Sequence, residues 1–336
     1  ELSAVDGIIY RRQGKQVTTR VRKQMPNLDE LPLPARHLAE HYRSQYHWLH
    51  WDKHAPIETS RGCPYRCTFC AVWVFHRGRC RFKAPESVVK EVKAANSPVI
   101  CFVDDNFLQD VRRAERIYQL IKDSGIRAQY WVQARADTVA KHPRIIEQWA
   151  EIGLDAVFVG FETCNDEVLA SYNKRASVST NEEAARILRD NGVAIWGALI
   201  VDPQWTKSDF DVLIDYVRSL KICFPIFTVL TPIPGTPLFQ QKFKELRTLD
   251  YEVFDFLHSV LPTRLPIEEF YSNMARLYAS TTMGFRELKQ RVREGHIPIS
   301  SLGRVREVLR DVTNPQAYIN NLMQAKANED SSGATR

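Results

Sequence analysis

The chain has 336 residues, of which 44% are hydrophobic and 26% charged, an ordinary composition for a globular protein. Its formal net charge of +6 is spread along the sequence, without the concentrated basic stripe that a nucleic-acid partner would require. Seven cysteines are too few for a disulfide scaffold, and no run of 18 apolar residues predicts a membrane span. We therefore expect a globular protein of a reducing cytoplasm.

Residues 1–54 are predicted to be a linker rather than a domain. The chain begins without Met and with a strand-like stretch, DGIIY, already under way, which we interpret as the start of a fragment. The Pro-containing stretch NLDELPLPARHLAEHYR then leads into the first regular unit. The basic run YRRQGKQVTTRVRK is interpreted as a solvated face, with contact to phosphate or anionic lipid as the alternative.

Residues 55–245 alternate between short apolar stretches and amphipathic helical stretches. Near-continuous apolar strands that alternate with helices predict a parallel sheet covered by helices. Six such units are two short of a closed barrel, so we expect an α/β fold, a partial (β/α)6 TIM-like barrel with its chemistry at the carboxyl ends of the strands. The predicted strands are 56–60, 98–104, 128–133, 155–162, 193–201 and 226–232, and the predicted helices are 85–95, 111–125, 143–153, 181–192 and 207–220.

The alternation stops after residue 245. Residues 246–326 are predicted to be a helical C-terminal substrate region, because amphipathic patterns cover 266–282 and 300–312. Residues 327–336 are polar and are expected to form a disordered tail.

Three cysteines are clustered directly after the first predicted strand. In RGCPYRCTFC, Cys63, Cys67 and Cys70 have the spacing C-x3-C-x2-C. Three thiolates on a [4Fe–4S] cluster leave one iron without a protein ligand, so a chelating small molecule is expected at the fourth position. Structural zinc completed by Cys80 or His76, or an iron–sulfur scaffold without catalysis, is the alternative, although no second C-x2-C pair is present.

This motif, with Phe69 before the last cysteine, resembles the radical S-adenosylmethionine (SAM) superfamily. The resemblance implies that the methionyl amine and carboxylate of SAM bind the fourth iron, and that one electron from the cluster releases a hydrogen-abstracting 5′-deoxyadenosyl radical. It assigns catalytic and metal-binding roles to Cys63, Cys67 and Cys70 and a cofactor contact to Phe69. A reducing donor such as flavodoxin or ferredoxin is implied as a partner.

Two carboxylates and an amide end the second predicted strand, in FVDDNF. Burying such groups is costly unless they bind something. The resemblance places the groups that hold the methionyl amine here, and we predict Asp104 and Asp105 as cofactor contacts. A turn or helix-cap role is the alternative for Asp105 and Asn106.

Polar residues also follow the third and fourth strands. Gln133 and Arg135 alternate with alanine and therefore share a face, and Arg135 is expected to counter a carboxylate, with an Arg135–Asp137 brace as the alternative. The resemblance implies that Glu162 bonds the ribose hydroxyls and that Lys174 contacts the methionyl carboxylate. A lone surface lysine is the alternative for Lys174.

The fifth and sixth predicted strands give weaker evidence for cofactor contacts. Gly197 marks a place where the backbone is expected to approach a neighbour closely, and we predict a cofactor contact there. The following VDPQWT departs from the Gly-rich turn of many family members. The sixth strand ends in TPIPGTPLF, which matches a turn of the cobalamin-dependent members.

Four features together resemble the cobalamin-dependent (class B) branch of the superfamily. They are the linker-like start of the chain and the stretches RGCPYRCTFCAVWVF, DDNF and PGTPLF. The resemblance implies a cobalamin-binding domain upstream, absent from this chain, and transfer of a methyl group from methylcobalamin to a substrate carbon radical. Within this branch the chain is most like the hopanoid C-3 methylases, through the stretches FVDDNFLQD, NGVAIWGALIVDPQWT and FDFLHSVLPTRLPIEEFY. We therefore expect C-3 methylation of a hopanoid.

The expected substrate is an apolar small molecule, lipid-like or a tetrapyrrole. An apolar pocket with Phe254 and Phe256 would suit a triterpenoid, while a helical cap that packs its own core is the alternative. A tetrapyrrole methylase or cyclase of the same branch would share every barrel motif. The expected location is the cytoplasm, with peripheral association with a membrane as the open alternative.

Overall fold

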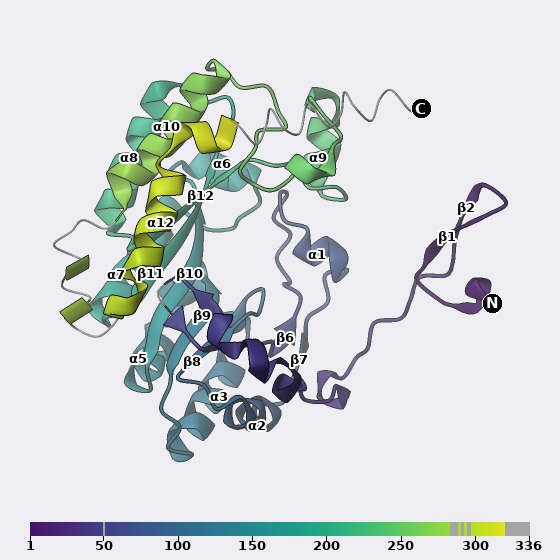
Figure 1. Cartoon of the computed structure of the whole chain (residues 1–336), viewed down its shortest axis with the longest axis vertical. Helices are drawn as coiled ribbons and strands as arrows, with labels where there is room; N and C mark the ends of the chain where they lie inside the picture. Colours follow the sequence, from purple (N-terminus) through teal and green to yellow (C-terminus); the bar gives the residue numbers. More distant parts are fainter. Residues whose placement is uncertain (50, 283–287, 290–291, 294–296, 320–336) are drawn as a thin grey trace.

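A six-stranded parallel sheet organises the chain (Figure 1). The computed structural model describes residues 1–319 except 50, 283–287, 290–291 and 294–296. The sheet order is β12-β11-β10-β9-β8-β5, so strands that follow one another in the chain also lie side by side. This confirms the predicted partial barrel. The strands are β5 (His54–Ile57), β8 (Val99–Phe102), β9 (Gln129–Arg135), β10 (Leu154–Glu162), β11 (Ala194–Val201) and β12 (Phe224–Val229).

Helices connect successive strands and cover the outer face of the sheet (Figure 1). Pro85 and Pro143 occupy first turns, where a missing N–H costs nothing, as the sequence predicted. The longer connecting helices are α2 (Pro85–Ala95), α3 (Val111–Asp123), α5 (Pro143–Glu151), α7 (Val178–Asp190) and α8 (Lys207–Leu220). Shorter ones are α1 (Val72–Phe75), α4 (Ala136–Lys141), α6 (Asp166–Ser171) and α9 (Pro237–Lys242).

Two described helices follow the barrel, as the predicted helical extension requires, whereas residues 246–266 are mostly irregular. Helices α10 (Ile267–Thr281) and α12 (Leu302–Val312) lie beside β12 (Figure 1). Tyr278 ties α10 to the sheet, because its hydroxyl accepts from the Phe227 N–H at 3.1 Å and donates to the Phe227 carbonyl at 3.3 Å. Arg276 on α10 also pairs with Asp211 on α8. The predicted tail, 327–336, lies outside the described residues.

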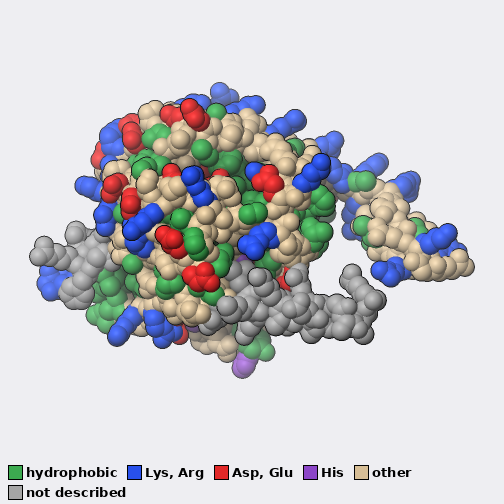
Figure 2. Space-filling model, turned by 90° about the horizontal axis from the view of Figure 1, so that it is seen from above, with side chains coloured by type: hydrophobic (Ala, Val, Ile, Leu, Met, Phe, Trp, Pro, Cys, Tyr) green, Lys and Arg blue, Asp and Glu red, His purple; other side chains and the backbone are tan. Residues whose placement is uncertain are grey.

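Short elements complete the chain. The N-terminal hairpin of β1 (Ile9–Arg12) and β2 (Lys15–Thr18) stands away from the barrel and carries the basic run, with its Lys and Arg side chains exposed (Figures 1 and 2). On the face shown in Figure 2, acidic and basic side chains are otherwise interspersed. The 3-10 helices are η1 (Leu2–Ala4), η2 (Leu28–Glu30), η3 (Arg36–Gln45), η4 (Phe107–Gln109), η5 (Phe243–Glu245), η6 (Tyr251–Val253) and η7 (Ile299–Ser301).

A tryptophan cluster fills the inside of the sheet at the amino ends of the strands. It includes Trp131 and Trp196, each the third residue of its strand. A hairpin of β3 (His47–Trp48) and β4 (Trp51–Asp52) adds two more rings, and Trp51 stacks on Trp196 with ring centroids 5.5 Å apart. Residues 47–52, within the predicted linker, therefore pack against the sheet. None of the described helices is long and apolar enough to cross a membrane.

The outer core, between sheet and helices, is centred on Trp149 of α5. Its ring makes edge-to-face contacts with Phe102, Phe107 and Tyr130, with centroids 5.1–5.9 Å apart. Its indole N–H donates to the Ala114 carbonyl at 3.2 Å. This ring therefore joins α3, α5, β8 and β9.

Truncating this ring should destabilise the whole domain. We expect Trp149→Ala to lower the free energy of unfolding by about 3–5 kcal/mol, because a large cavity would remain in a packed core. Urea denaturation followed by circular dichroism measures the change. The matched control is Leu249→Ala, whose side chain is exposed and whose expected change is about 0.5 kcal/mol or less. Equal effects of the two substitutions would contradict this description of the core.

Candidate active site

The three clustered cysteines lie on one loop at the carboxyl end of β5. The strands β6 (Ser60–Arg61) and β7 (Arg81–Phe82) pair in antiparallel fashion and close the loop, residues 62–80, at its base. Gly62 has a φ of +95°, and a Cβ there would lie 2.2 Å from the Arg79 carbonyl oxygen. Only glycine fits this closure, since a side chain would collide with the returning backbone.

Asp104, directly after β8, holds the segment that leads into the cysteine loop. Its carboxylate accepts from the Thr59 N–H at 2.7 Å, the Thr59 hydroxyl at 2.6 Å and the Ser60 N–H at 2.5 Å. The residue is fully buried, and burial raises the pKa of its carboxyl group. Both oxygens are engaged by the chain itself, so the residue acts as a brace, and its contact with a cofactor stays a prediction.

Asp105 and Asn106 remain candidates for contact with a ligand. Asp105 accepts from the Gly62 N–H at 2.8 Å, and 28% of its side chain is exposed. Asn106 is 1% exposed, and within the described part of the chain neither polar atom of its amide has a hydrogen-bond partner. A buried amide without partners is rare in proteins and indicates a place where a polar ligand or water completes the bonding.

Arg135 is the last residue of β9, and its guanidinium is hydrogen-bonded to residues in and around the cysteine loop. Its guanidinium donates to Asp137 at 2.8 and 3.3 Å, to the Cys67 sulfur at 3.8 Å and to the Lys174 carbonyl. The Tyr65 ring covers one face of the group, with its centroid 3.6 Å from Cζ. Of the two interpretations left open by the sequence, this geometry supports the brace.

Glu162 and Lys174 form a buried ion pair at the same edge of the sheet. The ammonium lies 2.5 Å from Glu162 Oε1, and the two residues are 7% and 5% exposed. Lys174 is therefore not a surface lysine. Glu162 has a φ of +64°, a conformation that L-residues rarely adopt and that is most often retained at functional sites. Their predicted contacts with ribose and carboxylate stay predictions.

The other predicted contacts differ in their surroundings. Phe69 packs edge-to-face on Tyr172, with centroids 5.2 Å apart, which fixes the loop to the segment after α6. Gln133 is partly exposed on β9, on the same face as Arg135. At Gly197 a Cβ would lie 2.7 Å from Ile222 and 3.1 Å from Phe161, so the core approaches the backbone closely there, and the cofactor contact stays a prediction.

Sequence reasoning missed the role of Tyr65. It lies between Cys63 and Cys67, and besides covering Arg135 its hydroxyl lies 3.4 Å from Asp137. An aromatic residue inside a three-cysteine loop was the available signal, but only the folded chain reveals its partner on β9.

Burial disfavours loss of the proton from the Cys63 and Cys70 thiols. Burial raises the pKa of Cys63 to about 11 and also raises the pKa of Cys70, where negative charge on Cys67, Glu162 and Asp105 adds to the effect. A thiol must lose its proton to become a metal ligand, so iron would have to compensate for this burial. Three thiols on one anchored loop are the donor set that a [4Fe–4S] cluster with one open iron requires.

One residue named for the zinc alternative has other contacts. His76, proposed as a fourth ligand, contacts the Arg81 guanidinium at 3.0 Å through Nδ1 and lies 3.9 Å from Asp105 through Nε2. Across residues 1–319, outside the undescribed positions, no three Cys, His, Asp or Glu side chains are grouped as a single ion requires. A cubane cluster does not need that grouping, because its thiolates bind different iron atoms.

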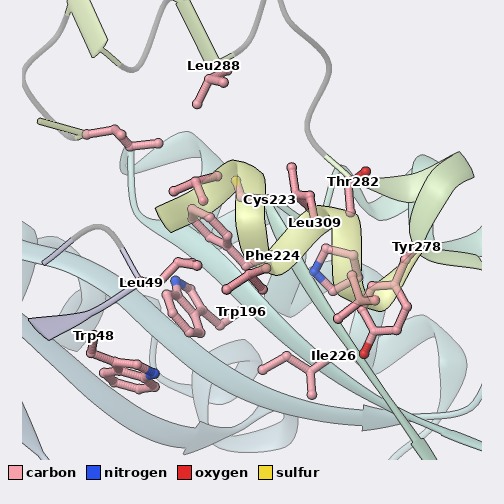
Figure 3. Close-up of a pocket in the computed structure, with 15 residues that line it drawn as sticks. Trp48, Leu49, Trp196, Cys223, Phe224, Ile226, Tyr278, Thr282, Leu288 and Leu309 are labelled. Carbon is pink, nitrogen blue, oxygen red and sulfur yellow. The ribbon is translucent and has the colours of Figure 1, made fainter. Parts of the chain in front are cut away.

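An apolar cavity of about 300 Å³ lies at the other end of the strands (Figure 3). It is lined at the starts of β11 and β12, between the tryptophan cluster and α12, whereas the cysteine loop follows the end of β5. The cavity is therefore separate from the candidate site. Its lining includes Trp48, Trp196, Phe224, Ile226, Tyr278 and Leu309.

Comparison with known proteins agrees with this geometry. Residues 57–217 match the model of the Radical SAM superfamily. These residues are a radical SAM domain. The family uses a [4Fe–4S] cluster and SAM, and the anchored three-cysteine loop lies within the matched range.

Curated relatives of this chain include methylases. It is 35% identical over 250 residues to hopanoid C-3 methylase of Methylococcus capsulatus, a match that covers 74% of this chain and 48% of the relative. It is 27% identical over 245 residues to bacteriochlorophyllide d C-12(1)-methyltransferase of Chlorobaculum tepidum, covering 70% of this chain and 53% of the relative. The chain thus spans about half the length of the curated relatives it matches.

Solved structures with a similar fold include a cobalamin-dependent radical SAM enzyme and a radical SAM methyltransferase. OxsB, with aqua-cobalamin and SAM bound, matches with a TM-score of 0.63 at 17% identity, over 97% of this chain and 56% of that one. TsrM of Kitasatospora setae, with cobalamin and a [4Fe–4S] cluster bound, matches with a TM-score of 0.53 at 16% identity, over 74% of this chain and 51% of that one. At these identities the comparison supports the fold.

The Asp104 brace makes a direct prediction. Asp104→Ala should lower the free energy of unfolding by about 2–5 kcal/mol, because two buried N–H groups lose their acceptor. Asp104→Asn should cost much less, since its amide oxygen still accepts from the Thr59 and Ser60 N–H groups and it carries no buried charge. Urea denaturation measures both. Equal losses in the two variants would contradict a hydrogen-bonding role.

Proposed function

We propose that this chain is the catalytic part of an enzyme that methylates an unactivated carbon of an apolar small molecule, with C-3 of a hopanoid as the target. The observation that carries the proposal is the anchored loop with Cys63, Cys67 and Cys70, inside a radical SAM domain. The 35% identity to a hopanoid C-3 methylase supports the substrate.

The three cysteines would hold three irons of the cluster and leave the fourth for SAM. When bound and reduced, the cluster supplies the electron that cleaves SAM and so provides a hydrogen-abstracting radical. Asp105, Asn106 and Gln133 lie at or next to the carboxyl ends of β8 and β9, and we propose them as contacts for SAM. The amide of Asn106 has no hydrogen-bond partner among the residues that the structure describes. The Glu162–Lys174 pair would present charge toward the same ligand.

Exposed apolar side chains at the same edge support an apolar substrate. The Phe256 carbonyl accepts from the N–H of Val229, the last residue of β12, at 2.7 Å, which fixes residues 254–258 at a carboxyl end of the sheet. Phe256 is 46% exposed and Leu257 42% exposed. Neighbouring exposed apolar groups of this kind mark binding surfaces. Phe254 is partly buried beside them.

Cobalamin is proposed as the methyl carrier, bound mainly by a part of the protein outside this chain. Its presence in the OxsB and TsrM structures supports this assignment. Within the chain we propose residues 1–54 as a linker, 55–245 as the barrel and 246–326 as the substrate region. A flavodoxin or ferredoxin as electron donor, a cytoplasmic location and peripheral contact with a membrane belong to the same proposal.

A tetrapyrrole substrate is the second candidate. It is favoured by the 27% identity to a bacteriochlorophyllide methyltransferase, which extends over nearly the same share of the chain as the match to the hopanoid methylase.

The test uses the full-length protein, reconstituted anaerobically with iron, sulfide and cobalamin and supplied with SAM and dithionite. With a hopanoid we expect 5′-deoxyadenosine and a product one methyl group heavier, measured by mass spectrometry. Replacing Cys63, Cys67 or Cys70 with Ala should abolish both, whereas Cys80→Ala, the matched control, should retain them. Methylation of a bacteriochlorophyllide alone would favour the second candidate. A full cluster that forms no 5′-deoxyadenosine would contradict both.

A further inference from the structure

Among the side chains that the structure describes, Arg135 is a buried cation that donates a hydrogen bond to a cysteine of the loop. It is 6% exposed, and its Nη1 lies 3.8 Å from the Cys67 sulfur. We propose that Arg135 is a positioning residue that raises the reduction potential of the iron–sulfur cluster through an N–H···S bond to Cys67. The inference rests on the proposed function, since it presupposes a cluster on this loop.

The physical basis is the extra negative charge that a cluster acquires on reduction. Hydrogen bonds to the sulfurs and nearby positive charge stabilise the reduced form more than the oxidised one, and so raise the potential. The guanidinium is shielded from water by Tyr65 on one face and by burial elsewhere. Its charge therefore acts on the sulfur with less screening than a surface arginine would show.

Asp137 sets both the direction and the strength of this effect. Its two oxygens take the Nε and Nη2 protons, which leaves Nη1 directed at Cys67. The carboxylate also offsets part of the arginine charge. Asp137→Asn would keep an acceptor for the guanidinium but remove that opposing charge, so the cluster would feel a stronger cation.

Opposite shifts in two variants therefore distinguish this role from a structural one. Arg135→Gln removes the cation and should lower the potential, whereas Asp137→Asn should raise it. Each shift should correspond to at least a tenfold change in the ratio of reduced to oxidised cluster at a fixed applied potential, which is about 59 mV for one electron. A merely structural defect would disturb both variants in the same sense.

The experiment is a dithionite titration of the reconstituted chain, followed by electron paramagnetic resonance without SAM. Iron content and thermal unfolding are measured for each variant. The matched control is Arg113→Gln, which removes an arginine that is 8% exposed and donates to the Lys83 and Thr59 carbonyls but not to a cysteine, and its potential should stay at the wild-type value. If Arg135→Gln takes up no iron, the test rests on Asp137→Asn. A raised cluster potential in that variant supports the proposal, and an unchanged or lowered potential overturns it.

The results that overturn the inference differ in whether they also affect the proposed function. Wild-type potentials in both variants on a full complement of iron, or an equal shift in Arg113→Gln, overturn this inference alone. A wild-type chain that takes up no iron overturns the proposed function as well.

Discussion

Three thiolates can share one cluster only if the loop that carries them is held in one conformation. In this chain that constraint is met by buried charges from neighbouring strands. Asp104, after β8, binds the backbone just before the loop, and Arg135, at the end of β9, contacts Cys67 within it. The sheet order β9-β8-β5 brings these strand ends side by side, so the parallel topology itself assembles the site.

Buried charges are poor sources of stability, because their desolvation offsets most of their attraction. The edge of this sheet nevertheless holds two pairs, Arg135–Asp137 and Glu162–Lys174, beside the cysteine loop. Buried pairs of this kind at the carboxyl ends of strands are typical of a site shaped for a charged ligand. At the opposite end, the tryptophan cluster closes the barrel and leaves the carboxyl ends of the strands as the place for chemistry.

The strands, the helices and the place of the cysteine loop were predictable, because apolar periodicity and proline punctuation report directly on backbone structure. The roles of single polar residues were not. A carboxylate after a strand looks the same in sequence whether it faces a ligand, as proposed for Asp105, or the backbone of a neighbour, as Asp104 does. The hairpin with Trp48 and Trp51 was missed because two-residue strands are too short to show a period.

The most direct test of the account is whether SAM reaches the iron that the three cysteines leave open. The chain would be reconstituted anaerobically, reduced with dithionite and examined by electron paramagnetic resonance with and without SAM. We predict a [4Fe–4S]+ signal whose g-values change when SAM is added. A signal that is the same in both samples, or zinc in place of iron, would contradict the account, because the cysteines would then hold a metal without an open site.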